Sequence, residues 1–238
     1  MTGPQPKPRL HFAAVTSHLD VVFLDVGGPI YDDRVYYASL LRAIRQEDPS
    51  VTDEAFDDEY ERCRLAQNGS FRRHIIPALL GPAADVDRVA ENAEQWWDYP
   101  PESLLPDVKP CLQALTEAGY RLAVLANQPA RTRETLRRDG LDRYISLYSI
   151  SDELGYEKPD PRIFAHAVDQ AGVDPARTAM VGDRLDNDVR PARAAGMFGV
   201  WLLRGEAPQD PTPAQVAEAD ATIRSLDELP ATLESLSR

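Results

Sequence analysis

Four short segments of the sequence carry the side chains that could do chemistry. They are Leu24-Asp25-Val26-Gly27-Gly28, Ala126-Asn127-Gln128, Glu157-Lys158-Pro159 and the stretch from Val181 to Asp188. Among their side chains are the carboxylates of Asp25, Asp183 and Asp188 and the amine of Lys158. Carboxylates held close together repel one another unless a cation neutralises them. Oxygen ligands alone are typical of a Mg²⁺ site, and a lysine beside such a site can hold a phosphate group as a point charge.

The elements around these segments must bring them together. The apolar run from Val21 to Val26 predicts a strand that is buried on both faces, as in a parallel sheet. From Leu105 onward predicted helices and strands alternate, which indicates an α/β fold with a doubly wound parallel sheet. The expected helices cover 108–118, 130–138, 160–171 and 186–195, and the expected strands cover 121–126, 145–150, 178–181, 198–203 and 221–223. The four segments lie at carboxyl ends of strands, which converge on one crevice in such a sheet.

Residues 32–101 have a different pattern, with apolar residues at helical spacing and no convincing strand. About four helices are expected: one with Tyr36, Leu40, Leu41 and Ile44 at helical spacing, and three over 53–66, 71–80 and 86–99. The last two end before Gly81-Pro82 and Pro100-Pro101. We expect this block to be a helical cap over the carboxyl ends of the strands. The predicted organisation is a flexible N-terminal tail (1–19), a core made of 20–31 and 102–238, and a helical cap (32–101).

Composition and charge narrow the classes of function. The chain of 238 residues has a net charge of −13, which argues against non-specific binding to nucleic acid. No apolar run approaches the length needed to span a membrane. Cys63 and Cys111 are far apart in the sequence, which suggests neither a disulfide framework nor a zinc site and is typical of a reduced compartment. We expect a cytoplasmic monomer or homodimer with no nucleic-acid or membrane partner.

From about Val21 to its C-terminus, the chain resembles the haloacid dehalogenase superfamily of aspartate-nucleophile hydrolases. The most specific motifs are Gly155-Tyr156-Glu157-Lys158-Pro159-Asp160 followed by Ile163-Phe164, and Val181-Gly182-Asp183 through Asn187-Asp188 to Ala194-Ala195-Gly196-Met197. The helical block resembles the cap that this superfamily inserts after its first strand.

The resemblance implies a role for each residue that matches a motif. Asp25 is the nucleophile and a Mg²⁺ ligand, Asp183 is the second side-chain ligand, and the backbone carbonyl of Gly27 is the third protein ligand. Asp188 either holds a metal-bound water or orients Lys158, which binds phosphate. Backbone N–H groups at the turn formed by Gly27 and Gly28 would add donors for the phosphate, as would the segment with Ala126 and Asn127. The implied activity is a Mg²⁺-dependent phosphatase of a small phosphorylated metabolite, acting through an aspartyl-phosphate on Asp25.

Two departures from the superfamily pattern bear on the rate. Phosphatases of the superfamily usually have a second Asp two residues after the nucleophile, as general acid and base, but this chain has Gly27. Their second motif usually has a phosphate-binding Thr or Ser where this chain has Ala126. A positioned acid–base group contributes about 10²–10⁴ in rate, so we expect slow turnover or a preference for good leaving groups. Asp32 and Asp33 are near enough in sequence to replace the missing group.

The predicted cap offers candidates for substrate contact. They are Arg34, Tyr37, Arg72, Arg73 and His74, of which Arg73 and His74 are our chosen substrate-binding residues. The alternative is that the tyrosines pack between helices and the arginines lie along a hydrated surface.

Two other functions stay open. A 2-haloacid dehalogenase would use Asp25 on carbon, need no metal and tolerate Gly27, but it leaves the acidic pair Asp183 and Asp188 without a cation. A catalytically impaired relative that binds a phosphometabolite would explain both Gly27 and Ala126. It would not explain why Asp25, Lys158 and Asp183 are all present.

Overall fold

The computed structural model describes residues 19–237 and contains a six-stranded parallel sheet in the order β3-β2-β1-β4-β5-β6. The strands are β1 (Val21–Leu24), β2 (Arg121–Ala126), β3 (Ile145–Ile150), β4 (Thr178–Gly182), β5 (Phe198–Leu202) and β6 (Ala221–Ile223). The order runs outward from β1 in both directions, which is the doubly wound arrangement. The predicted fold class is therefore confirmed.

The central strand is buried because alternate side chains enter two different apolar layers. Val22 and Leu24 pack on the side that carries helices α5 (Val108–Glu117) and α11 (Leu229–Leu236). Val21 and Phe23 pack on the other side, under α8 (Pro161–Ala171) and α9 (Arg190–Ala194). A strand covered on both faces is continuously apolar, as the sequence predicts for this segment.

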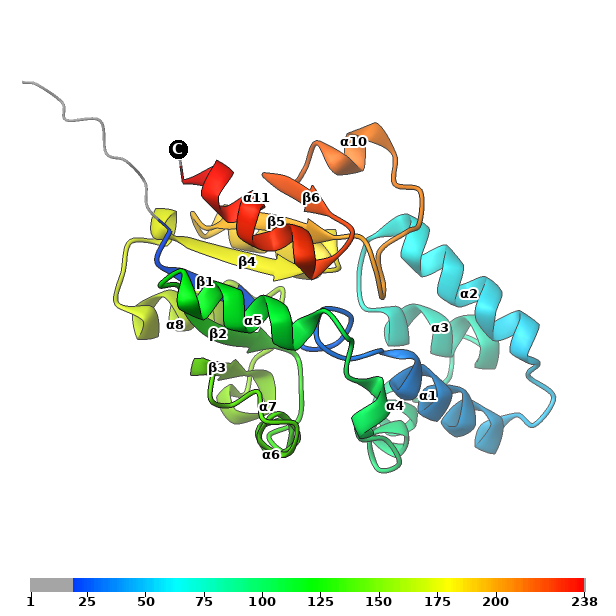
Figure 1. Cartoon of the computed structure of the whole chain (residues 1–238). Coiled ribbons are helices and arrows are strands. Elements are labelled where there is room, and N and C mark those ends of the chain that lie inside the picture. Colours follow the sequence, from blue (N-terminus) through cyan, green and yellow to red (C-terminus); the bar gives the residue numbers. More distant parts are fainter. Residues whose placement is uncertain (1–18, 238) are drawn as a thin grey trace, which may run out of the picture.

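Helices α1 (Arg34–Glu47), α2 (Asp53–Ala66), α3 (Phe71–Leu80) and α4 (Val86–Glu94) follow β1. They enclose an apolar cluster of their own, which includes Leu40, Ile44 and Ile75. Figure 1 shows these helices beyond the ends of the sheet to which the strand arrows point. We call α1–α4 the cap helices; the bounds 20–31, 32–101 and 102–238 for core and cap stay predictions.

Shorter elements complete the described chain. They are α6 (Thr132–Arg138), α7 (Ser151–Leu154), α10 (Pro213–Val216), a π-helical turn (Leu185–Val189) and short 3₁₀ turns at Pro101–Ser103, Pro175–Arg177 and Leu226–Glu228. The predicted N-terminal tail falls outside the described residues except for Leu19, which is fully buried. Among the helices of residues 19–237, none is long and apolar enough to cross a membrane.

Candidate active site

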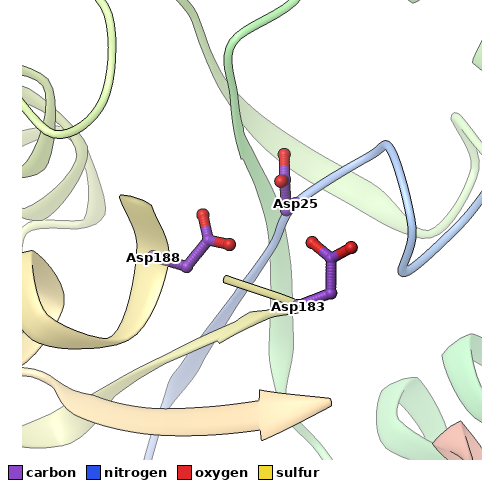
Figure 2. A group of neighbouring side chains, drawn as sticks. All are labelled: Asp25, Asp183 and Asp188. Atoms are coloured by element: carbon purple, nitrogen blue, oxygen red, sulfur yellow. The ribbon is translucent and has the colours of Figure 1, made fainter. Parts of the chain in front are cut away.

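The predicted carboxylates meet at the carboxyl ends of β1 and β4. Asp25 directly follows β1, Asp183 directly follows β4, and Asp188 lies in the π-helical turn. Each offers an oxygen within 4.8 Å of the oxygens of the other two, and all three residues are buried. Figure 2 shows the three carboxyl groups around one common space. The three carboxylates therefore lie together, as expected from their places in the sequence.

Lys158 supplies the positive charge inside this carboxylate cluster. Its Nζ lies 3.0 Å from Asp25 Oδ1 and donates to Asp188 Oδ1 at 2.6 Å, and its side chain is fully buried. Burial lowers the pKa of Lys158, but the carboxylates of Asp188 and Asp25 outweigh that effect and raise it. The lysine is therefore charged, and it compensates at most one of the three carboxylates.

Burial has the opposite effect on the acids. It raises the pKa of Asp25 to about 7, although the charge of Lys158 pulls the pKa down. Burial also raises the pKa of Asp183 well above its ordinary value, and the carboxylates of Glu206 and Asp33 raise it further. The side chain of Asp183 accepts a hydrogen bond from the backbone N–H of Glu206 at 2.7 Å. An excess of buried carboxylates is costly without a cation, and oxygen donors are what Mg²⁺ takes. The donor set thus fits a divalent cation.

On the side of β1 away from β4, Ala126 is the last residue of β2 and Asn127 directly follows it. Asn127 Oδ1 accepts from the backbone N–H of Lys158 at 2.6 Å, and Asn127 Nδ2 donates to the carbonyl of Lys158 at 2.8 Å. This pair of bonds makes Asn127 a positioning residue for the lysine. Ala126 is fully buried at the end of its strand.

The turn after Asp25 contains two glycines in different surroundings. Gly28 has a φ of +80°, and the carboxyl group of Asp183 occupies the space that a Cβ would need. Its N–H donates to the carbonyl of Tyr31 at 2.8 Å. Gly27 lines the cavity beside Asp25, and its missing Cβ would lie 2.3 Å from Asp33 Oδ1. Residue 27 therefore has no room for a side chain while Asp33 keeps this position.

A cavity of about 830 Å³ opens above the cluster. Its walls come from the core and from the cap helices, and include Asp25, Asp33, Tyr36, Arg72, Tyr99, Arg131, Lys158, Arg184 and Glu206. Burial raises the pKa of Asp33 well above its ordinary value, and the carboxylates of Glu206 and Asp25 add to that effect. Concave sites of this size bind small molecules.

The candidate substrate contacts of the cap separate in the structure. Tyr37 and Arg72 line the cavity, and Arg72 also pairs with Glu157 of the core at 3.1 Å. Arg73 and His74 are not among the residues that line it. Arg73 pairs with Asp87 at 3.0 Å, and His74 Nε2 lies 3.0 Å from the carbonyl of Asn68. The structure therefore does not bring Arg73 and His74 to the site.

Tyr99 and Glu206 also line the cavity, and neither was expected there from the sequence. Glu206 is in the loop after β5, so its place near a strand end could have marked it in the sequence. Tyr99 lies outside the helix in which we expected it, since α4 ends at Glu94. No motif marks Tyr99, and only the tertiary structure places it beside Asp33.

Comparison with known proteins agrees with this geometry. Residues 19–196 match the model of the haloacid dehalogenase-like hydrolase family. The chain belongs to this family. The resemblance stated from the motifs is therefore confirmed, and the family to which the chain belongs is a family of hydrolases.

Three relatives show how similar proteins have been described. A phosphoserine phosphatase of Thermus thermophilus is 40% identical over 149 residues, which cover 60% of this chain and 59% of that protein. The match thus spans less than two thirds of that relative's length. A structure described as a predicted phosphoglycolate phosphatase from Haemophilus somnus has a TM-score of 0.72 at 20% identity, covering 92% of this chain and 99% of that one. A 2-haloacid dehalogenase from Pseudomonas syringae has a TM-score of 0.59 at 24% identity, covering 91% and 99%. At these identities the two structures show only that this chain has their fold, and that fold does not distinguish a phosphatase from a dehalogenase.

Proposed function

We propose that this protein is a Mg²⁺-dependent phosphatase that hydrolyses a small phosphorylated metabolite through an aspartyl-phosphate on Asp25. The observation that carries the proposal is the buried group of Asp25, Asp183 and Asp188 with Lys158 3.0 Å from Asp25. The phosphatase relative that is 40% identical supports the same reaction class. The expectation of a cytoplasmic monomer or homodimer rests on the sequence.

The contacts of Asp25 assign its two oxygens. Oδ1 accepts from the backbone N–H of Val26 at 2.8 Å and from Lys158 at 3.0 Å. These contacts hold the carboxylate, so we assign the attack on phosphorus to Oδ2. The bond from Oδ2 to phosphorus forms as the bond from phosphorus to the substrate oxygen breaks. Water then displaces phosphate from Asp25, which restores the carboxylate.

Lys158 offsets the negative charge that gathers on the phosphoryl oxygens, and Asp188 and Asn127 hold it in place. Bound Mg²⁺ would be held by Asp25, Asp183 and the carbonyl of Gly27, and it would supply further positive charge at the same oxygens. Because residue 27 has no side chain, proton transfer to the leaving group needs another donor. Without one, the enzyme would be slow or restricted to good leaving groups, as Gly27 indicates in the sequence.

The dehalogenase alternative keeps one observation in its favour, which is Gly27. The excess of carboxylates over lysine in the buried cluster favours the phosphatase, because a reaction on carbon without metal gives Asp183 no partner cation. A phosphometabolite-binding protein without turnover would keep the same cluster, so only assays of activity separate it from the enzyme.

Phosphate release from a panel of substrates tests the proposal. The panel contains phosphoserine, sugar, nucleoside and acyl phosphates and p-nitrophenyl phosphate, each with Mg²⁺ and with EDTA. We expect release that requires Mg²⁺ and disappears in Asp25→Asn. The exposed Asp169 of α8 provides a matched control, and Asp169→Asn should keep the wild-type rate. Halide release from a 2-haloacid in EDTA, with no phosphate release, would replace the proposal by the dehalogenase.

A further inference from the structure

We infer that Asp33 is the general acid and base of the reaction, an inference that rests on the proposed phosphatase function. Gly27 stands where related phosphatases have their second Asp. The three atoms nearest to a Cβ built on Gly27 all belong to Asp33: Oδ1 at 2.3 Å, Oδ2 at 2.6 Å and Cγ at 2.8 Å. The carboxyl group of Asp33 thus occupies the space that a side chain at residue 27 would enter. The chain supplies a carboxyl group to that space from six positions later in the sequence.

A purely structural role does not account for this carboxyl group. Asp33 is the residue before α1, where an Asp side chain usually caps the helix, but its side chain makes no capping hydrogen bond. The neighbouring Asp32 instead accepts from the backbone N–H of Arg34 at 3.0 Å and pairs with the Arg34 side chain. Of the two acidic residues that the sequence offered, Asp32 serves the helix start and Asp33 lines the cavity.

Buried aromatic residues hold Asp33 in this position. Tyr99 is 1% exposed and donates its hydroxyl to Asp33 Oδ1 at 2.9 Å. Gln128 Nε2 donates to the Tyr99 hydroxyl at 3.2 Å, and the ring of Tyr99 stacks on Tyr31 with centroids 4.5 Å apart. Tyr99 is thus a positioning residue. Because Tyr99 engages Oδ1, we assign proton transfer to Oδ2.

The proton balances over the two steps. As the bond from phosphorus to the leaving oxygen breaks, that oxygen takes the proton from Asp33. Asp33, now a carboxylate, accepts a proton from the water that attacks the aspartyl-phosphate. The second step releases phosphate and leaves Asp25 ionised and Asp33 protonated, as at the start.

A leaving-group series separates this role from a structural one. Asp33→Asn keeps an oxygen that can accept from Tyr99 but cannot transfer the proton. We expect kcat for alkyl phosphates to fall about 10²–10⁴-fold. With p-nitrophenyl phosphate, whose leaving group needs no proton, we expect a burst of one nitrophenolate per enzyme and then slow turnover. Asp32→Asn is the matched control and should resemble the wild type with every substrate.

Moving the carboxyl group tests the shared position directly. Asp33→Ala removes all of the closest contacts to the Cβ position of Gly27, which has no positive φ. Gly27→Asp in that background should raise kcat for alkyl phosphates at least tenfold over Asp33→Ala alone. Gly27→Asp with Asp33 present should lower kcat, because the two carboxyl groups compete for one space.

The outcomes distinguish this inference from the proposed function. If the wild type shows Mg²⁺-dependent release that Asp25→Asn abolishes, while Asp33→Asn matches the wild type throughout the leaving-group series, only the role of Asp33 is overturned. The role of Asp33 is also overturned if Gly27→Asp, made in the Asp33→Ala background, gives no higher kcat for alkyl phosphates than Asp33→Ala alone. If the wild type releases no phosphate from any substrate, both proposals fall.

Discussion

Lys158 is the residue on which the buried charges of the site depend. It contacts Asp25 and Asp188, and all three side chains have little or no contact with water. Lys158→Met keeps an unbranched apolar stem and leaves the carboxylates without their cation. Removing one partner of a buried ion pair typically costs about 3–5 kcal/mol. We therefore expect urea denaturation of metal-free Lys158→Met at neutral pH to give a free energy of unfolding lower by about that amount, together with loss of phosphatase activity.

Lys109 provides the matched control, because it is exposed on α5. Lys109→Met should change the free energy of unfolding by no more than about 0.5 kcal/mol. Equal urea midpoints for Lys158→Met and Lys109→Met would show that Lys158 does not compensate the carboxylates as we describe.

At the scale of the elements, the end of α2 joins the cap helices to the catalytic loops. Gln67 follows α2 with a φ of 46° and is fully buried. Its Oε1 accepts from the backbone N–H of Leu185 at 2.8 Å, and its Nε2 donates to the carbonyl of Glu206 at 2.8 Å. The amide of one side chain thus bonds to the two loops that follow β4 and β5.

Shortening this side chain tests the junction. Asn tolerates a positive φ, so Gln67→Asn keeps the backbone and shortens the reach to both partners. A buried polar group left unpaired costs about 1–3 kcal/mol, and we expect the free energy of unfolding from urea denaturation to fall by that amount. Gln113→Asn, on the exposed side of α5, is the control and should behave as the wild type. If Gln67→Asn and Gln113→Asn had the same free energy of unfolding, the hydrogen bonds of the Gln67 side chain would not stabilise the protein.

The elements also show what the sequence could predict. The strands at 121–126, 145–150 and 221–223 and the helices at 53–66 and 71–80 have the predicted bounds, because local periodicity and end signals agree there. The helix expected over 86–99 ends at Glu94. Its last predicted residues include Trp97 and Tyr99, which instead turn into the core cluster beside Tyr31. Packing against residues that are distant in the sequence therefore ends this helix at Glu94, and no local sequence pattern predicts that end.

The same distinction applies to the candidate site. Asp25 and Asp183 could be placed from the sequence because each directly follows a strand, and strand ends meet. Lys158 was expected at a strand end as well, but α7 separates it from β3, so only its motif marked it in the sequence. Asp33 lies beyond a turn, and its approach to Gly27 depends on the path of the chain between β1 and α1. The helix expected at 186 begins as a π-helical turn, which carries Asp188 to Lys158. Such details depend on tertiary contacts that the pattern of residue types does not encode.

At the scale of the whole molecule, the acidic site couples stability to pH and to divalent cations. Burial raises the pKa of Asp25 from an ordinary value of 3.8 to about 7, and raises the pKa of Asp183 well above the same ordinary value. Between about pH 4 and about pH 7, these carboxyl groups keep protons in the folded protein that they have already released in the unfolded chain. Stability falls with rising pH wherever the folded state binds more protons. The metal-free protein should therefore lose stability as the pH rises from about 4 to about 7, by at most about 1.4 kcal/mol per pH unit for each such group.

Mg²⁺ should reduce this loss of stability, because it binds the ionised carboxylates of the folded state. A ligand at about 100 times its dissociation constant stabilises the folded state by about 2.7 kcal/mol. Thermal unfolding from pH 5 to pH 8, with EDTA and with Mg²⁺, measures the effect. We expect the midpoint to fall with pH in EDTA and to fall less in Mg²⁺. Asp183→Asn removes one buried charge, so its EDTA profile should be flatter and its response to Mg²⁺ smaller. A wild-type profile that Mg²⁺ does not change at any pH would contradict a divalent site at these three carboxylates.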